Sequence, residues 1–414
     1  MTQRDCRDAA FLAQPLVRQV LELLSTDGEE ARVIGGAVRN TLMRLPVADV
    51  DVATTAVPET VIARAEAAGL KVAPTGIEHG TVTVIGDRHV VEVTTLREDI
   101  ETDGRRAVVR FGRDWQADAE RRDFTINALS VDLDGTLHDP VGGLADLDAR
   151  KIRFIGSADR RIAEDRLRAL RFFRFHAAYG VGAPDAEGLA AAIRARHDLS
   201  GLSAERVGQE MRRLVVAKGA VPTLVLMQES GILPLISASV GDLIALAHLP
   251  DFEREEPSPA MRFAVLFGRV QEDVDRIGLR FRLSNAERNR MRAALSAASD
   301  LVNSSPDADH ATLYAIGEGA FLDGLTFAAA KGQLAPDDFV ARRAGAQSWP
   351  IPTFPLSGRD VVELGVDRGP LVGLLLRKLE REWIDDDFRA DAETLRQNLK
   401  AFLTSFRQQQ QQQQ

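Results

Sequence analysis

The hydrophobic pattern of this chain changes at about residue 157, and this change constrains the fold more than any other feature. Up to residue 156, short apolar segments alternate with polar residues and are separated by glycine-containing turns, which is typical of strands joined in a sheet. Beyond it we find only helical periodicity, interrupted at glycine and proline. The sequence therefore predicts an α+β region with a mixed sheet, followed by an entirely helical region.

Several elements of the first region follow from the same patterns. Residues 8–25 have the apolar spacing of an amphipathic helix, and Pro58 stands at the start of another helix, where proline is tolerated. Residues 81–96 are expected to form two paired strands around a Gly-Asp turn. Residues 98–118 are polar and without a period, so we expect a mobile loop there.

Composition limits where the protein works. Hydrophobic residues make up 45% and charged residues 27% of the chain, as in ordinary soluble proteins. No apolar run approaches the roughly 18 residues that a membrane-spanning helix needs, and the first residues do not resemble a signal peptide. The single cysteine, Cys6, cannot form an internal disulfide. We therefore expect a cytoplasmic protein with no membrane partner.

The charge of the chain is unevenly distributed. The net charge of −9 argues against a nucleic-acid partner. Residues 151–220, however, hold 14 Lys and Arg against 8 Asp and Glu, which gives 14 − 8 = +6. A polyanion could bind to this basic segment, while the acidic remainder limits non-specific binding.

The first candidate site combines a glycine pair with two carboxylates. Gly35 and Gly36 would let the backbone approach a triphosphate, and Arg39 could then pair with phosphate oxygens. Asp49 and Asp51 are separated by one residue, so on a strand they would point to the same side. Such a pair suits two divalent cations about 3.5–4 Å apart, and hard oxygen ligands favour Mg²⁺. Alone, this spacing of two aspartates is more often a solvated strand end.

Two further motifs could complete this site. Glu92 lies mid-strand and would supply a third carboxylate if its strand neighboured that of Asp51, although a lone strand glutamate is more often solvated. Arg122, Asp123 and Asn127 could meet a triphosphate and ribose hydroxyls. The alternative for this second motif is an ordinary helix start with Asp123 as its cap.

A fourth motif could recognise a nucleotide base. On a helix over residues 164–175, Asp165 and Arg168 would share one face, and Arg171 and Arg174 would continue that row. Asp accepts hydrogen bonds and Arg donates them, which matches the amino donor and ring-nitrogen acceptor of cytosine and adenine. Guanine and uracil present the reverse order, so a site of this kind would reject them. The alternative is a helix with structural ion pairs.

Taken in order over residues 31–213, these motifs resemble the class II CCA-adding tRNA nucleotidyltransferases and bacterial poly(A) polymerases. The matching segments are GGAVR, DVD, HGTVTV, VEVTTLR, RRDFTINAL, DPVGG, EDRLRALRFFRF and SAERVGQEM. The resemblance implies a polymerase-β-like nucleotidyltransferase head followed by an all-helical neck, body and tail. The implied domains are an N-terminal helix (1–30), the head (31–156), a neck that recognises the base (157–220), the body (221–330), a tRNA-binding tail (331–407) and a disordered glutamine run (408–414).

The resemblance also implies roles for the site residues. Catalysis would rest on Asp49, Asp51 and Glu92, with Mg²⁺ held by Asp49 and Asp51. Contacts to the nucleotide would come from Gly35, Gly36, Arg39, Arg122, Asp123, Asn127, Asp165, Arg168, Arg171 and Arg174, with Asp165 and Arg168 pairing with the base. Glu205, Arg206 and Glu210 would buttress the neck helices.

The implied activity is addition of C, C and A to the 3′ end of tRNA from CTP and ATP. The alternatives are a poly(A) polymerase, an enzyme that adds only A, and a non-catalytic RNA-binding protein; no protein partner can be inferred. Two departures from the family pattern stand out. Asn40 replaces the usual Asp after GGAVR, and Arg44-Leu45-Pro46 stands where the family often has glycine. The role of a carboxylate at residue 40 is therefore in doubt.

Overall fold

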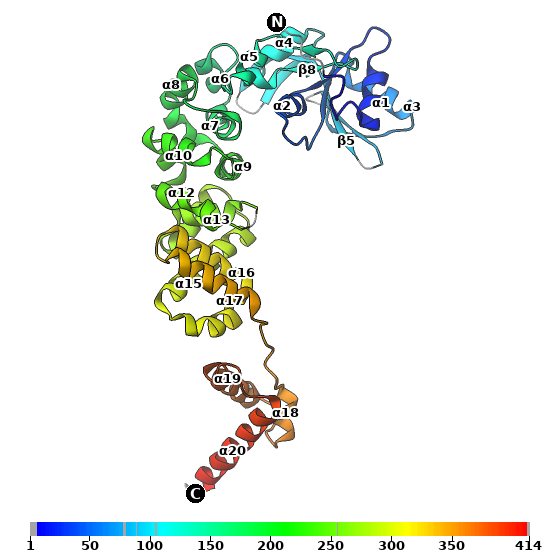
Figure 1. Ribbon diagram of the computed structural model, residues 1–414. Helices are drawn as coiled ribbons and strands as arrows, with labels where there is room; N and C mark the ends of the chain where they lie inside the picture. Colours follow the sequence, from blue (N-terminus) through cyan, green and yellow to red (C-terminus); the bar gives the residue numbers. More distant parts are fainter. Residues whose placement is uncertain (1–5, 78–79, 88, 104–105, 255, 412–414) are drawn as a thin grey trace. The chain divides into compact units, whose positions relative to one another are not determined.

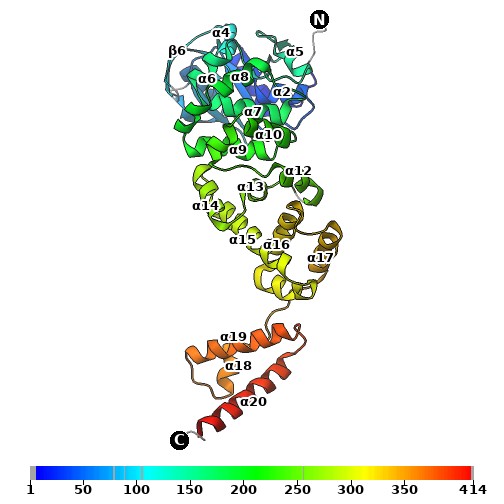
Figure 2. The same ribbon diagram turned by 90° about the vertical axis from the view of Figure 1, so that its left-hand side faces the viewer.

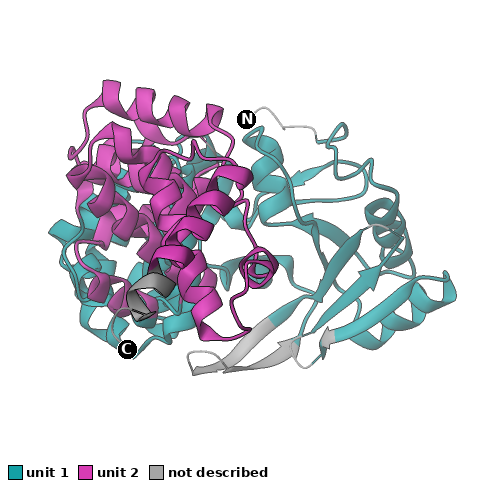
Figure 3. Ribbon diagram, turned by 90° about the horizontal axis from the view of Figure 1, so that it is seen from below, with its two compact units in different colours: residues 1–241, 279–282 teal, residues 242–278, 283–414 magenta. Residues whose placement is uncertain are grey.

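The computed structural model describes residues 6–77, 80–87, 89–103, 106–254 and 256–411. The chain divides into two compact units, shown in separate colours in Figure 3. Unit 1 comprises residues 1–241 together with 279–282, and unit 2 comprises residues 242–278 and 283–414. The boundaries expected between head, neck, body and tail do not coincide with this division and stay predictions.

A seven-stranded sheet in the order β3-β4-β5-β2-β1-β8-β9 forms the first part of unit 1. Strands β2 and β5 pair in parallel and the other neighbours are antiparallel, so the sheet is mixed, as predicted. The strands are β1 (Ala31–Ile34), β2 (Asp51–Thr54), β3 (Lys71–Gly76), β4 (Thr81–Ile85), β5 (Val90–Thr95), β8 (Ser130–Val131) and β9 (Leu137–His138).

The two faces of the sheet differ in what they carry. Val33, Val52 and Val93 are register partners on adjacent strands, and all three are fully buried. Helices α1 (Pro15–Leu24) and α3 (Pro58–Ala67) pack against β-strands and against each other, beside the sheet in Figure 1. Because side chains alternate along a strand, the next residues along each strand point to the opposite face, where the candidate catalytic carboxylates lie.

Two expectations for unit 1 were wrong in detail. Helix α1 is shorter than residues 8–25 because Pro15 occupies its first turn. The segment expected to be a loop forms β6 (Arg97–Asp103) and β7 (Arg106–Phe111), which pair with each other in a separate two-stranded sheet, followed by α4 (Trp115–Glu120). A register shift between Asp99 and Glu101 interrupts the alternation, so no strand period was visible.

Helices complete unit 1, as the change in periodicity predicted (Figure 2). An aromatic cluster joins them to the sheet region: the ring centroids of Phe124 lie 4.8 Å from Phe154 and 4.9 Å from Phe175. This cluster holds α7, which carries several candidate site residues. The helices are α2 (Gly36–Leu42), α5 (Gly143–Asp148), α6 (Ala158–Glu164), α7 (Leu167–Tyr179), α8 (Ala186–Arg194), α9 (Ala204–Val215), α10 (Ala220–Glu229) and α11 (Ile232–Ser237).

Unit 2 is helical throughout its regular elements, also as predicted. One core cluster centres on Phe321 and Phe339, and another on Val361 and Trp383. Among the described residues, no helix is long and apolar enough to cross a membrane. The helices are α12 (Leu243–Phe252), α13 (Pro259–Phe267), α14 (Gln271–Arg280, whose last two residues fall in unit 1), α15 (Asn285–Asn303), α16 (Asp309–Ala330), α17 (Pro336–Ser348), α18 (Gly358–Glu363), α19 (Pro370–Asp385) and α20 (Ala392–Gln411).

The glutamine run differs from its expectation. Helix α20 continues into the run and ends at Gln411, where we had expected no regular structure. Glutamine has a reasonable helix propensity, so an existing helix can extend through it. Residues 412–414 lie outside the described part of the chain.

Candidate active site

Two of the three candidate catalytic carboxylates are direct neighbours across the sheet. Asp51 on β2 is the register partner of Glu92 on β5, so both side chains point to the same face. The strand of Glu92 therefore neighbours that of Asp51, which is the condition under which Glu92 could supply a third carboxylate. Asp49 lies in the loop before β2 rather than on the strand, so the expected geometry of two aspartates on one strand was wrong for this residue.

The electrostatics of this group favour a bound cation. Burial raises the pKa of Asp51, and the nearby carboxyls of Glu92 and Asp49 raise it further, while Arg122 acts in the opposite direction. A divalent cation among these oxygens would relieve that repulsion, and carboxylate oxygens are the ligands Mg²⁺ prefers. Within the described ranges, no three acidic, His or Cys side chains are yet close enough together to hold a metal. The donor set therefore fits magnesium in chemistry, although the side chains are not gathered around a common point.

The guanidinium of Arg122 lies beside the Gly-Gly turn, close to these carboxylates. Gly35 has φ +65°, a conformation that favours glycine, and a Cβ atom there would lie 3.9 Å from the guanidinium of Arg122. Arg122 and Arg121 both donate to the buried carboxylate of Asp118 on α4, at 2.8 and 2.7 Å. Asp118 thus fixes Arg122 beside the turn, and Arg122 lowers the pKa of Asp118 in return.

Arg39 lies almost fully buried behind the same turn. Its guanidinium donates to Asn127 Oδ1 (2.5 Å), to Asn40 Oδ1 (2.9 Å from Nη2) and to the hydroxyl of Tyr179 (2.8 Å). The ring centroid of Tyr179 lies 4.1 Å from its central carbon. Asn40 also donates to Pro46 O (2.8 Å), which ties the helix that follows the turn to the segment before β2.

Asn127 connects Arg39 to a chain of buried ion pairs. It donates to Asp123 (3.0 Å), which accepts from Arg171 on α7 (2.8 Å from Nε). Glu210 on α9 pairs in turn with Arg174 and, at 3.8 Å, with Arg171. Burial opposes ionisation of Asp123, but Arg171 and the hydrogen bond from Asn127 prevail and lower its pKa. The structure therefore assembles these predicted residues into one network that joins the sheet region to helices α7 and α9.

The proposed base-reading pair has a different geometry from the one expected. Asp165 is not on the helix with Arg168: it lies in extended conformation (φ −149°, ψ 108°) between α6 and α7. Its carboxylate accepts the N–H of Leu167 (3.1 Å), a local bond that competes with continuing the helix. Asp165 also accepts from Arg206 (2.7 Å), and Arg168 donates to Glu164 (2.5 Å). The two side chains are thus held by separate partners rather than by each other.

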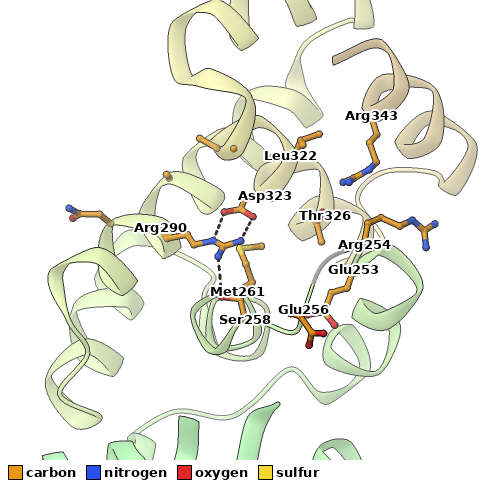
Figure 4. Close-up of a pocket in the computed structure, with 14 residues that line it drawn as sticks. Glu253, Arg254, Glu256, Ser258, Met261, Arg290, Leu322, Asp323, Thr326 and Arg343 are labelled. Atoms are coloured by element: carbon orange, nitrogen blue, oxygen red, sulfur yellow. Dashed lines mark hydrogen bonds and ion pairs between the residues drawn. The ribbon is translucent and has the colours of Figure 1, made fainter. Parts of the chain in front are cut away.

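Hollows in the structure are consistent with this location in unit 1. A pocket of about 390 Å³ is bounded by Ile34, the register partner of Asp51, and by Arg122. A pocket of about 470 Å³ in unit 2 contains none of the predicted site residues. In it, Arg290 points to Asp323 and binds it through two nitrogens, at 2.7 and 2.9 Å (Figure 4). Its chemistry is that of an ion-paired surface hollow, and we assign the candidate active site to unit 1.

Sequence reasoning missed two members of the site. Asp118 precedes Arg121 and Arg122 by three and four residues, a helical spacing that could have revealed it. Tyr179 meets Arg39 across 140 positions of the chain, and no local pattern signals such a contact.

Comparisons with known proteins show which family the chain resembles. Residues 31–153 match the family model described as the poly A polymerase head domain. The CCA tRNA nucleotidyltransferase 1, mitochondrial, of Mus musculus is 34% identical, over 93% of this chain and 89% of its own. The CCA-adding enzyme of Latilactobacillus sakei subsp. sakei is 30% identical, over 91% and 95%. The crystal structure of the Bacillus stearothermophilus CCA-adding enzyme in complex with CTP matches with a TM-score of 0.75 at 28% identity, over 95% of this chain and 98% of that one. Motifs, fold and relatives thus agree, and the chain belongs to the class II CCA tRNA nucleotidyltransferase family.

Proposed function

We propose that this protein adds C, C and A in turn to the 3′ end of tRNA, using CTP and ATP without a nucleic-acid template and releasing pyrophosphate. The observation that carries the proposal is the pairing of Asp51 with Glu92 on adjacent strands, beside a Gly-Gly turn lined by Arg122. The reaction is an in-line attack of the RNA 3′-hydroxyl on the α-phosphorus. Catalysis of this kind rests mainly on positioning and electrostatics.

Asp49 and Asp51 would hold two Mg²⁺ ions, with Glu92 as the third carboxylate. When bound, such ions lower the pKa of the attacking hydroxyl and stabilise the leaving pyrophosphate. The chain's own contribution is to place Arg122 beside the Gly-Gly turn, where it would meet the phosphates together with Arg39. Burial raises the pKa of Asp51, and the carboxyls of Glu92 and Asp49 raise it further. A cation would remove that repulsion, which supports this assignment.

Asp165 and Arg168 would read the base. Arg206 and Glu164 hold these two side chains from outside the pair, so each can turn an unused polar edge toward a base. Arg168 donates through Nη1 and Nη2, and within the described residues its Nε–H has no acceptor. An acceptor beside a donor selects C and A over G and U, because the mismatched bases would leave polar groups unpaired.

The proposed RNA partner is tRNA, because the name of the relative from Mus musculus, CCA tRNA nucleotidyltransferase 1, mitochondrial, includes tRNA. The basic segment 151–220 includes helix α7, which carries Arg168, Arg171 and Arg174, and this supports an RNA site there. Binding of tRNA by the predicted tail (331–407), and cytoplasmic location, stay predictions. The relatives' names favour CCA addition over the alternatives of poly(A) synthesis or addition of A alone.

The test is to incubate the protein with Mg²⁺ and tRNA that ends at its discriminator base, and to resolve products at single-nucleotide length. We expect two additions with CTP alone, a third only when ATP is also present, and none with GTP or UTP. A long ladder of A would mean a poly(A) polymerase, and a single A added only to tRNA ending in CC would mean an A-adding enzyme. No addition by folded protein that binds tRNA would refute the enzymatic proposal and leave an RNA-binding protein.

A further inference from the structure

Arg39 is a buried cation without a carboxylate partner. It is 6% exposed, yet its three acceptors, Asn40, Asn127 and the hydroxyl of Tyr179, are all uncharged. No ion pair to Arg39 occurs within 4.0 Å among the described residues. Arginine stays protonated in proteins, so this burial keeps a full positive charge away from water. Such an arrangement is costly unless an anion joins it.

No carboxylate of the surrounding ionic chain contacts Arg39 directly, although Asp123 is near enough to favour its charge. Asp123 is engaged by Arg171, and Glu210 is engaged by Arg174 and Arg171. The cluster therefore contains three guanidinium groups and two carboxylates, which leaves one positive charge in excess. Arg39 is the member that lacks a direct carboxylate contact, and it follows the Gly-Gly turn directly: a Cβ atom at Gly36 would lie 3.7 Å from its Nη2. The excess charge thus sits where substrate phosphates are expected.

Tyr179 fixes this charge from the neck. It is the last residue of α7, the helix that also carries Arg168, Arg171 and Arg174, whereas Arg39 lies on α2 beside the sheet. Its hydroxyl accepts from Arg39 at 2.8 Å, and its ring lies against the guanidinium at 4.1 Å. A carboxylate in this place would offset the charge of Arg39, but a tyrosine holds the guanidinium and leaves its charge in place.

We propose that Tyr179 is a positioning residue, which holds the buried Arg39 with neutral groups only, so that its charge stays available for the triphosphate of the incoming nucleotide. This inference rests on the proposed function, since it names the anion as the triphosphate of CTP or ATP. It also links the two parts of unit 1: the helix that bears the base-reading Arg168 would set the position of a phosphate-binding residue beside the sheet. The same contact serves both nucleotides, because their triphosphates are identical.

The chain offers a matched control for testing this role. It contains two tyrosines, Tyr179 and Tyr314, and the hydroxyl of Tyr314 donates to Glu380 within unit 2 (2.5 Å). Tyr179→Phe removes the acceptor but keeps the ring, and Tyr314→Phe makes the same chemical change elsewhere. For Tyr179→Phe we expect the KM for CTP and for ATP to rise together by about 5- to 10-fold, because a hydrogen bond to a charged group is lost. The KM for tRNA and the unfolding temperature should match those of Tyr314→Phe.

A spectroscopic measurement tests the same contact without turnover. Protein labelled with 3-fluorotyrosine carries two ¹⁹F signals, which the two Phe variants assign. Titration with CTP, and with inorganic pyrophosphate, should shift the Tyr179 signal and leave that of Tyr314 in place. Unchanged KM values together with a Tyr179 signal that ignores CTP would overturn the inference, as would a loss confined to tRNA binding or thermal stability. If the protein adds no nucleotide but CTP still shifts the Tyr179 signal, the proposed function fails and this contact to a triphosphate stands.

Discussion

Two arginines with equal burial, one in each unit, are held in different ways. Arg39 in unit 1 and Arg342 in unit 2 are each 6% exposed. Arg342 donates to both carboxylate oxygens of Asp309 and to Leu301 O, so its charge is offset and its donors are satisfied. Arg39 has uncharged partners only. The first arrangement is complete without a ligand and stabilises the fold, whereas the second leaves charge for a substrate.

The carboxylates show the same contrast. In unit 2, Glu253 is paired with the buried Arg262, and Asp273 is paired with Arg276. In unit 1, burial raises the pKa of Asp51, and the nearby carboxyls of Glu92 and Asp49 raise it further. Carboxyls that repel each other in the free protein do not stabilise its fold, so their presence points to another role. Unit 1 therefore carries electrostatic cost at the positions where a substrate or a cation would bind.

The largest effect should come from Asp51. Asp51→Asn keeps the size of the side chain but removes the negative charge that would bind Mg²⁺ under the proposed function, so we expect the rate of nucleotide addition to fall by on the order of 10³-fold. Because the substitution also removes repulsion among three carboxyls, the unfolding temperature should stay equal or rise. Single-turnover addition of one C from CTP, with release of pyrophosphate, measures the rate, and a thermal melt measures the unfolding temperature. If the activity of Asp51→Asn falls only as much as its folded fraction does, the charge of Asp51 serves stability rather than substrate or cation binding, and the difference from the paired carboxylates of unit 2 disappears.

A matched pair of substitutions tests the two arginines directly. Arg342→Met leaves the carboxylate of Asp309 without its partner in unit 2, so we expect a loss of about 3–5 kcal/mol in the free energy of unfolding. Arg39→Met leaves neutral acceptors only and removes an unpaired cation, so its cost should be about 1 kcal/mol or less. The nucleotide KM should show the opposite order, with a rise of about 10-fold or more for Arg39→Met alone.

Tryptophan fluorescence can follow this pair, because Trp349 and Trp383 lie in unit 2 and Trp115 lies in unit 1. In a Trp115→Phe background, urea unfolding reports unit 2 and measures the cost of Arg342→Met. In a Trp349→Phe, Trp383→Phe background, Trp115 reports unit 1 and measures the cost of Arg39→Met. Equal losses in the free energy of unfolding, or equal effects on nucleotide binding, would erase the distinction between the two arginines.

The sequence predicted the features of the fold that depend on the spacing of residues close together in the chain. The change of periodicity predicted the mixed sheet and the helical remainder, because alternation and helical spacing are local properties. The sequence left open whether the strand of Glu92 neighbours that of Asp51, and the register of β2 and β5 shows that it does. The break between α6 and α7 was missed, because the side chain of Asp165 competes with the helix through one hydrogen bond to Leu167.

Contacts between residues far apart in the sequence could not be predicted from local patterns. Tyr179 and Arg39 meet because the phenylalanine cluster packs α7 against the sheet region, which depends on the whole of unit 1. The hairpin β6–β7 was hidden by its register shift. Tertiary packing of this kind is specified by many side chains together, so no single motif predicts it.

A smaller effect tests where the segment 279–282 belongs. This segment lies within the sequence of unit 2 but packs with unit 1. Gly208 on α9 touches it so closely that a Cβ atom would collide with Phe281 O, whereas a Cβ atom at Gly201 would meet nothing within 4 Å. Gly208→Ala should therefore cost about 1–3 kcal/mol through overpacking, and Gly201→Ala should be near neutral. Thermal melts compare them. Equal stability of the two variants would mean that the segment is free to move away.

The smallest effect we expect is an acid-dependent loosening of unit 1 at Asp118. Arg122 and Arg121 lower the pKa of this buried carboxyl below its ordinary value. A group whose pKa is lower in the folded state stabilises the protein above its unfolded pKa, and that contribution is lost as pH falls through the folded pKa. The loss should therefore begin below about pH 4. Trp115 lies on the same helix, α4, and reports it by fluorescence. Asp118→Asn should flatten this pH dependence and free Arg122, which would raise the nucleotide KM at neutral pH. If the acid transition at Trp115 is unchanged in that variant, a different carboxylate governs it, and Asp118 does not anchor the phosphate-facing arginine.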